Sequence, residues 1–256
     1  MEKLPEIVNS AYEEITPVPN REGNLLFFTR VGYPEFDRTL VLDTTDWAKK
    51  LKPDAYRKFL GEVYSEIAGY TIFDPERSKF NQDVWIAHGD SATFTGVEHP
   101  GPPLNNALPN SITAITPDPN AYYCINHFKR TGDMSKGFSI IRYRSDSLLW
   151  QFPEPVEIEE YYTITSEVNL TMSFDGKILI LSAIRHDSRD MDLYVCFRQD
   201  DRHWSAPQNL GTVVNSMRRE TTPFLSEDHT SLFFSSNREG GDNDIYISKR
   251  LDDTWT

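Results

Sequence analysis

One order of short segments occurs four times along the 256-residue chain. Each copy begins with a segment that we call the lead-in, which contains Asn-Ser in most copies. A short strand and a turn follow the lead-in. Next come an apolar strand and then a strand in which apolar and polar residues alternate. A final aromatic residue opens a fourth strand, and these residues lie 56, 54 and 51 residues apart: Phe94, Trp150, Trp204 and Trp255. A period near 50 residues with four strands in each copy indicates a repeat architecture.

Predicted strands fall at matching places in each copy. The first strands are 15–18, 112–115, 169–172 and 222–225, and the second strands are 25–29, 122–126, 178–181 and 232–235. The third strands are 84–86, 138–143, 193–197 and 245–247. We therefore divide one domain, residues 1–256, into units of about 9–104, 105–158, 159–212 and 213–256.

Each unit is too small to be stable alone. Ordering a residue costs roughly 1–2 kcal/mol, and a lone sheet of three or four strands buries little apolar surface. Stacking the sheets face to face buries large side chains at roughly 1.5–3 kcal/mol each, and a ring leaves only short edges. The sequence predicts an all-β fold, a β-propeller of four-stranded antiparallel blades, with four blades countable in this ring or a larger one.

Two segments depart from the repeat. Residues 43–80 interrupt blade 1, and residues 53–69 within them predict a helix, because Pro53 suits a first turn and Gly69 a C-terminal stop. The last blade ends at Trp255-Thr256, where a fourth strand opens. Either the protein continues beyond Thr256, or the N-terminal segment KLPEIVNS completes the last sheet.

One family resembles the repeat closely. The stretch WSAPQNLGTVVNSMRRETTPFLSEDHTSLFFSSNREGGDNDIYISKR, residues 204–250, resembles the TolB-like, WD40-related (PD40-type) propeller repeat of bacterial envelope proteins. Blade 2 departs from the pattern at Gly137-Phe138-Ser139 and Ala121, and residues 38–80 lie outside it. The resemblance implies a periplasmic setting in a Gram-negative bacterium and a larger, OmpA-family-associated parent chain. The resemblance says little about function, because proteins with the β-propeller fold have many different activities.

Composition excludes several partner classes. The net charge of −13 disfavours nucleic acid and anionic lipid. The sequence contains no run of 18 apolar residues, so it predicts no membrane span. Residues 1–10 lack the apolar core of a signal peptide. Cys124 and Cys196 lie in predicted strands of different repeats, so the sequence favours two buried thiols over a disulfide and leaves the redox compartment open.

Acidic residues at repeated positions are the candidates for catalysis. The pairs Asp190/Asp192 and Asp242/Asp244 precede third strands, and Asp83 has the equivalent place in the first unit. Two neighbouring carboxylates could bind Ca²⁺ or act as an acid–base pair, but a carboxylate that caps a turn is favoured. Glycosidases of the propeller class use inward carboxylates at blade starts. Glu14, Glu167 and Glu220 hold such places and are the catalytic candidates if the protein is an enzyme.

Other chemistry has little support in the sequence. The six histidines lie in different loops without metal-ligand spacing, so no metal is predicted. A G-x-S-x-G elbow, a P-loop and a dinucleotide fingerprint are all absent, so no cofactor is predicted.

Loops between second and third strands are the binding candidates. All such loops emerge at one end of a propeller, and the 43–80 insertion is predicted to pack at that end. The candidate binding residues come from two loops and the insertion: Arg185, His186, Arg189, Asn237, Arg238, Tyr56 and Phe59.

The sequence favours a non-catalytic propeller scaffold that binds a protein, peptide or envelope ligand at the loop end. The alternatives are a glycosidase-like propeller enzyme, the regulatory half of a peptidase, or a ligand-sensing domain. The sequence does not indicate the oligomeric state.

Overall fold

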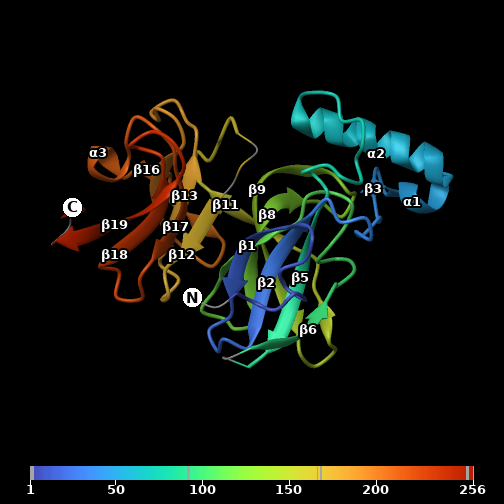
Figure 1. The fold of residues 1–256 in the computed structure, drawn as a ribbon, viewed down its shortest axis with the longest axis horizontal. Helices are drawn as coiled ribbons and strands as arrows, with labels where there is room; N and C mark the ends of the chain where they lie inside the picture. The colour runs from blue at the N-terminus through green and yellow to red at the C-terminus, as the bar shows by residue number, and fades with distance from the viewer. Residues whose placement is uncertain (1–2, 91–92, 166, 168, 252–253, 256) are drawn as a thin grey trace. The chain divides into compact units, whose positions relative to one another are not determined.

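The fold is of the β-propeller class, with four successive antiparallel sheets as its blades. Figure 1 draws the strands of these sheets as arrows. The computed structural model describes residues 3–90, 93–165, 167, 169–251 and 254–255. These residues cluster into two compact units: residues 1–115 with 119–154 hold blades 1 and 2, and residues 116–118 with 155–256 hold blades 3 and 4.

The first unit contains two sheets. In blade 1 the order is β1 (Glu13–Pro19), β2 (Leu25–Val31), β5 (Gln82–Gly89) and β6 (Phe94–Glu98). In blade 2, β7 (Ile112–Ile115) pairs with β8 (Ala121–Phe128), β8 with β9 (Met134–Arg144), and β10 (Leu149–Trp150) with β9.

The second unit contains blades 3 and 4. Blade 3 has the order β12 (Asn169–Met172), β13 (Ile178–Ala183), β14 (Asp192–Phe197) and β16 (Gln208–Asn209). Blade 4 has the order β17 (Glu220–Leu225), β18 (Ser231–Ser236), β19 (Asp244–Leu251) and β20 (Thr254–Trp255). The short helix α3 (Gly211–Val214) connects them, and β11 (Glu154–Ile158) pairs in parallel with β15 (His203–Trp204).

Apolar side chains join the two blades of each unit. In the first unit Phe27 and Val84 of blade 1 cluster with Ile112, Tyr122 and Ile141 of blade 2. In the second unit Ile180 and Leu193 of blade 3 cluster with three side chains of blade 4: Leu225, Leu232 and Phe234. This packing buries the side of each sheet that a lone blade would expose to water.

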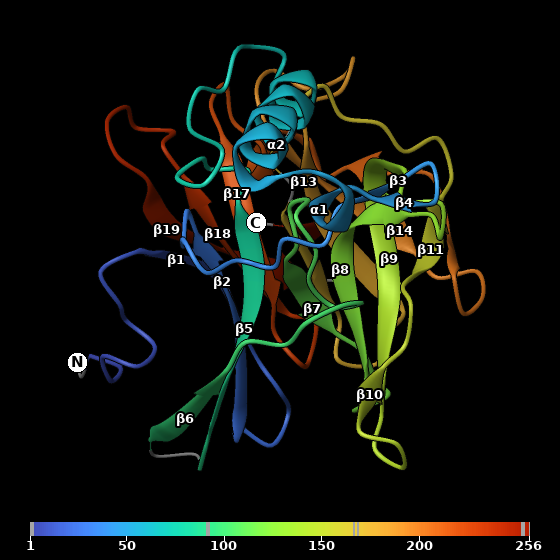
Figure 2. The same cartoon turned by 90° about the vertical axis from the view of Figure 1, so that its right-hand side faces the viewer.

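The insertion in blade 1 forms the predicted helix and a small core of its own. Helix α2 (Pro53–Ala68) has Pro at its first turn, and Gly69 ends it at φ 75°. Helix α1 (Trp47–Lys50) and the hairpin β3 (Val41–Leu42) and β4 (Thr45–Asp46) precede it. Leu60 and Tyr64 cluster with Phe128, which ends β8, and Met134, which begins β9. Figure 2 shows β3 and β4 of the insertion at the upper end of β9. Within the first unit the insertion therefore packs on the predicted loop end.

Three further features of the structure bear on the repeat. Blade 4 has its own short fourth strand, β20, and the N-terminal segment contains a turn, with the Val8 amide donating to the Pro5 carbonyl at 2.9 Å. The parallel pairing of β11 with β15 was not predicted. Among the repeated aromatic residues, Trp204 is fully buried, whereas Trp150 and Phe94 are half-buried. The side chain of Trp255 lies outside the described part.

Candidate functional site

Glu14, a candidate catalytic carboxylate, is tied into its own blade. Its Oε1 accepts hydrogen bonds from the Ser10 hydroxyl at 2.5 Å and the Ser10 amide at 3.2 Å. The guanidinium of Arg30, at the end of β2, bonds the same oxygen at 3.2 Å. The side chain of Glu14 is only 15% exposed, so these contacts hold it as a buried ion pair.

Glu220 repeats this arrangement in blade 4. It accepts from the Ser216 amide at 2.9 Å, from the Ser216 hydroxyl at 2.6 Å and from the Ser236 hydroxyl at 2.7 Å. Nη2 of Arg238 lies 3.6 Å from its Oε1, and the side chain is fully buried. The carboxylate therefore has the same place and the same serine and arginine partners in two blades. These contacts hold the lead-in of each blade in position.

Glu167, the third candidate carboxylate, is different. Its Oε2 lies 2.5 Å from Nη2 of Arg219, and both side chains are substantially exposed, at 46% and 39%. The structure therefore gives the three predicted carboxylates two kinds of surroundings. Glu14 and Glu220 hold the structure of their own blades together, whereas Glu167 forms an ion pair at the surface, which contributes little to stability.

An arginine at or just after the end of the second strand anchors the lead-in in three blades. Arg30 donates to the carbonyl of Ile7 at 2.6 Å, Arg185 to that of Glu160 at 3.0 Å, and Arg238 to that of Val214 at 2.5 Å. In blade 2 Asn126 takes this place and donates to the carbonyl of Pro109 at 3.0 Å.

Aromatic rings flank the same guanidinium groups. Arg30 lies 4.3 Å from the ring centre of Trp85, and Arg238 lies 4.7 Å from that of Tyr246. Arg185 lies 4.4 Å from Tyr162 and is 8% exposed. Arg185 and Arg238, predicted as binding residues, are thus held by the fold, and their binding role stays a prediction.

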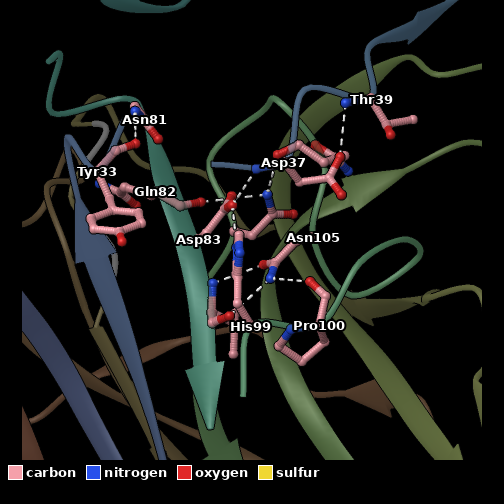
Figure 3. Close-up of polar contacts among 12 residues, drawn as sticks. Tyr33, Asp37, Thr39, Asn81, Gln82, Asp83, His99, Pro100 and Asn105 are labelled. Carbon is pink, nitrogen blue, oxygen red and sulfur yellow. Dashed lines mark hydrogen bonds and ion pairs between the residues drawn. The ribbon is translucent and has the colours of Figure 1, made fainter. Parts of the chain in front are cut away.

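A buried carboxylate–imidazole pair lies at the start of β5 in blade 1. Figure 3 shows Asp83 bonded to Nε2 of His99 at 2.7 Å and to the backbone amide of Asp37 at 2.6 Å. Burial raises the pKa of Asp83, and the bonds from His99 and from the Asp37 amide oppose the increase. The His99 ring stacks on Trp85 with centres 4.2 Å apart and planes within 6°. The expected local turn cap is therefore replaced by a contact with His99, 16 residues away.

Blade 3 holds a matching pair, which argues that Asp83 and His99 are structural. Asp192, at the same place in β14, accepts from Nδ2 of Asn209 at 2.9 Å. Beside each pair, an asparagine of the following lead-in bonds both backbone groups of the next strand residue. Asn105 does so with Val84 at 2.7 and 2.8 Å, and Asn215 with Leu193 at 2.8 and 2.9 Å.

The loop ends of blades 3 and 4 meet within the second unit. The Ile164 amide donates to the Ile184 carbonyl at 3.1 Å, and the Glu220 amide donates to the Met191 carbonyl at 2.7 Å. The Asn237 side chain accepts from the Arg219 amide at 3.1 Å, so this candidate binding residue also orients a lead-in. The His186 ring hydrogen-bonds the Tyr162 hydroxyl.

Apolar and basic side chains are exposed together at this end. Ile164 is 75% exposed, Met217 69% and Tyr162 40%. Arg189, in the loop that contains His186, and Arg218, next to Met217 in the sequence, are also exposed, and within the part of the chain that the structure describes neither guanidinium forms an ion pair. We call this set the loop-end surface; its members are Tyr162, Ile164, His186, Arg189, Met217 and Arg218. Sequence reasoning found His186 and Arg189 but missed the lead-in residues, whose exposure no local pattern reveals.

Two predicted binding residues of the insertion face its interior. Tyr56 is 4% exposed and donates its hydroxyl to the Arg38 carbonyl at 2.7 Å. Phe59 is partly buried and packs its ring against Trp47, with centres 4.9 Å apart. Tyr56 is therefore not accessible to a partner, because helix α2 turns this side toward the core of the insertion. The exposed aromatic residues of the insertion follow the helix instead: Tyr70 at 53% and Phe73 at 91%.

The described residues hold no group of three or more His, Cys, Asp or Glu side chains that suits a metal ion. No described helix is long and apolar enough to cross a membrane. Cys124 and Cys196 are both free and buried.

Comparison with known proteins gives remote structural similarity alone. No protein-family model matches the chain. No curated protein matches it either. Among solved structures, it resembles a putative TolB from Agrobacterium tumefaciens at 13% identity and TM-score 0.42, covering 95% of this chain and 79% of that one. TolB from Acinetobacter baumannii aligns at 12% identity and TM-score 0.37, covering 91% and 65%.

A periplasmic gluconolactonase from Pseudomonas aeruginosa is also similar, at 17% identity and TM-score 0.38. That alignment covers 66% of this chain and 46% of the gluconolactonase, so the chain spans about half of that protein. Similarity this remote carries no conclusion about activity or partner. The assignment to the β-propeller type rests on the four sheets and their repeated contacts.

Proposed function

We propose that the chain is a non-catalytic propeller scaffold that binds a peptide segment of a protein partner at the loop-end surface. The observation that carries this proposal is the exposure of Ile164 and Met217 at the same loop end as Arg189 and Arg218, whose guanidinium groups form no ion pair with a described residue. Exposed apolar side chains next to arginines are typical of binding surfaces, since arginine adds directional hydrogen bonds to apolar contact.

The surroundings of the carboxylates favour binding over glycoside hydrolysis. A glycosidase needs two carboxyl groups that face the substrate, one of them free to transfer a proton. Glu14 and Glu220 are instead saturated by serine and arginine partners inside their blades. The Asp83–His99 pair has the same place in the repeat as the Asp192–Asn209 pair, in which a side-chain amide takes the place of the imidazole.

The charge at the surface selects the chemistry of the partner. The protein carries a net charge of −13, yet this end presents two exposed arginines that form no ion pair among the residues that the structure describes. A peptide with one or two carboxylates next to aliphatic or aromatic side chains satisfies both features. The resemblance of residues 204–250 to the TolB-like envelope repeat supports a periplasmic setting in a larger protein for this binding.

Selection from a random peptide display library tests the proposal. We expect enriched peptides to share an acidic residue near an apolar one. We also expect Arg189→Glu with Arg218→Glu to weaken their binding by about 30-fold or more, because attraction becomes repulsion. Lys58→Glu is the matched control, since this lysine is 81% exposed in the other unit and binding there should not change. Equal binding to the double variant, or no shared sequence, would contradict the proposal.

A hydrolase assay separates the binding scaffold from the enzyme alternative. We expect the protein not to hydrolyse a panel of glycosides and lactones, and Glu14→Gln, Glu167→Gln and Glu220→Gln to leave the background rate unchanged. Circular dichroism of each variant establishes that it folds. Hydrolysis by the wild type that disappears in a folded variant would instead identify a catalytic carboxylate.

A further inference from the structure

Glu167 and Arg219 form an ion pair that connects the lead-ins of blades 3 and 4. The pair joins Oε2 of Glu167, which precedes β12, to Nη2 of Arg219, which precedes β17, at 2.5 Å. Strands β12 and β17 contact each other, as Figure 1 also shows, so the pair lies where two neighbouring strands begin. Both residues belong to the second unit, and their contact is therefore defined by that unit alone.

The pair differs from the buried carboxylate–arginine pair of blade 1. The side chains of Glu14 and Arg30 are 15% and 7% exposed, whereas those of Glu167 and Arg219 are 46% and 39% exposed. Among the residues that the structure describes, Glu167 is the only side-chain partner of the Arg219 guanidinium. An exposed ion pair contributes little to stability, because water competes for both charges. A carboxylate from another molecule can therefore replace Glu167 at little cost to the fold.

Exposed apolar side chains flank the pair in the sequence. Ile164 lies three residues before Glu167 and is 75% exposed, and Met217 lies two residues before Arg219 and is 69% exposed. Arg218, between Met217 and Arg219, is also exposed. The loop-end surface thus already contains an arginine with a carboxylate bound to it and apolar side chains close by in the sequence. An acidic and apolar peptide offers the same two kinds of group.

We propose that Arg219 binds the carboxylate of the peptide, and that Glu167 occupies Arg219 until the peptide displaces it. This inference rests on the proposed function, since it names the acceptor and the internal competitor at the same surface. A guanidinium presents parallel N–H groups that suit any carboxylate, so one carboxylate replaces another in kind. Glu167 lowers the apparent affinity according to the fraction of molecules in which it holds Arg219. A neutral peptide leaves the pair intact and gains no bond to Arg219, so the arginine selects for acidic peptides.

A double-mutant cycle tests the displacement. The probe is the most enriched peptide of the display selection, labelled with fluorescein, and fluorescence polarisation gives its dissociation constant. We expect Glu167→Gln to tighten binding by about 5- to 10-fold, because Arg219 is then available in every molecule. Arg219→Gln should weaken binding by about 10-fold, because a charge-assisted hydrogen bond is lost. In the Arg219→Gln background, Glu167→Gln should change the dissociation constant by less than about twofold.

Two controls separate displacement from a general effect of charge. Glu239→Gln removes an exposed carboxylate from the loop after β18, in the same unit, and should leave the dissociation constant within about twofold of the wild type. The same peptide with its acidic residue replaced by the corresponding amide should bind wild type and Glu167→Gln equally. Circular dichroism establishes that each variant folds, which the exposure of both side chains favours.

The outcomes distinguish this inference from the proposed function. Glu167→Gln that fails to tighten binding, or that tightens it equally in the Arg219→Gln background, would overturn the displacement and leave peptide binding standing. Arg219→Gln that binds the acidic peptide as well as the wild type does would overturn the role of Arg219 in the same way. A display selection that enriches no common sequence would instead contradict the proposed function, and the displacement with it.

Discussion

At the scale of single residues, side chains of one type make contacts within the fold at repeated positions and are exposed at positions outside the repeat. Arg30, Arg185 and Arg238 each donate to a lead-in carbonyl and lie beside an aromatic ring, whereas Arg189 makes neither contact with any residue that the structure describes. In the sequence Glu14 and Glu220 each follow a serine by four residues, and this recurrence was not recognised as a structural pattern. Their arginine partners were not recognised, because the residues after a second strand read as loop.

Asp192 gives a residue-scale prediction about pH. Burial raises the pKa of this carboxyl, and the contact with Asn209 only partly opposes the increase. A raised pKa means that the folded state binds more protons than the unfolded state, so stability is lost as pH rises from about 4, the unfolded pKa, through the folded pKa. Asp192→Asn removes that titration and keeps the acceptor for Asn209.

Urea unfolding of wild type and variant at several pH values measures this effect. We expect the free energy of unfolding of the wild type to fall relative to that of Asp192→Asn between about pH 4 and neutrality. Asp190→Asn, at a neighbouring residue that is half-buried, serves as the control. A difference between wild type and Asp192→Asn that does not change with pH would contradict the assigned cause.

At the scale of elements, the strands and the helix with strong local sequence signals were predicted well, whereas the elements that depend on tertiary contacts were not. Strands centred on Phe27, Ile180 and Phe233 and the helix after Pro53 follow from apolar runs, turn residues and end signals in the sequence. The hairpin of β3 and β4 has two-residue strands, and the pairing of β11 with β15 joins segments 45 residues or more apart. Such elements depend on neighbours that no local pattern specifies.

The contact between the insertion and blade 2 supplies an element-scale prediction. Gly132 has φ of 102°, and a Cβ there would lie 1.7 Å from the Val41 carbonyl oxygen of β3. The Thr44 amide donates to the Thr131 carbonyl at 2.9 Å in the same place. Gly132→Ala should therefore cost about 2–4 kcal/mol, from backbone strain together with separation of the hairpin from the loop.

Two measurements check this expectation. Urea unfolding gives the loss of stability, and trypsin should cut the variant faster in the insertion, at Arg57 or Lys58. Gly240→Ala is the matched control, because Gly240 also has a positive φ, 81°, but no atom lies within 4 Å of its added Cβ. The control should cost only about 1 kcal/mol. Equal losses in the two variants would show that the close contact with β3 contributes nothing.

At the scale of the whole molecule, the repeat distributes its apolar surface over two separate units. Each unit has a cluster between its own two blades, and the first unit also buries the core of the insertion. The sequence predicted the four blades from their period but not this grouping. The grouping depends on which side chains of successive sheets contact each other. The sequence does not indicate this, because every blade has a similar strand pattern.

The two native thiols allow the units to be followed separately. Cys124 lies in the first unit and Cys196 in the second, and burial raises the pKa of each thiol to about 12. The thiolate is the reactive form, so about one thiol in 10⁴ is ionised at pH 8 and the folded protein should resist a disulfide reagent. Unfolding exposes a thiol with an ordinary pKa near 8.5, which reacts rapidly.

Cys124→Ala and Cys196→Ala each leave one reporter, and labelling across a urea series gives its midpoint. We expect Cys196 to react at lower urea than Cys124, because the first unit has the additional insertion core to disrupt. Tryptophan fluorescence of both variants controls for any shift that the substitution itself causes. If both thiols react at one midpoint, the chain unfolds as a single cooperative body, and the grouping into two units has no energetic meaning.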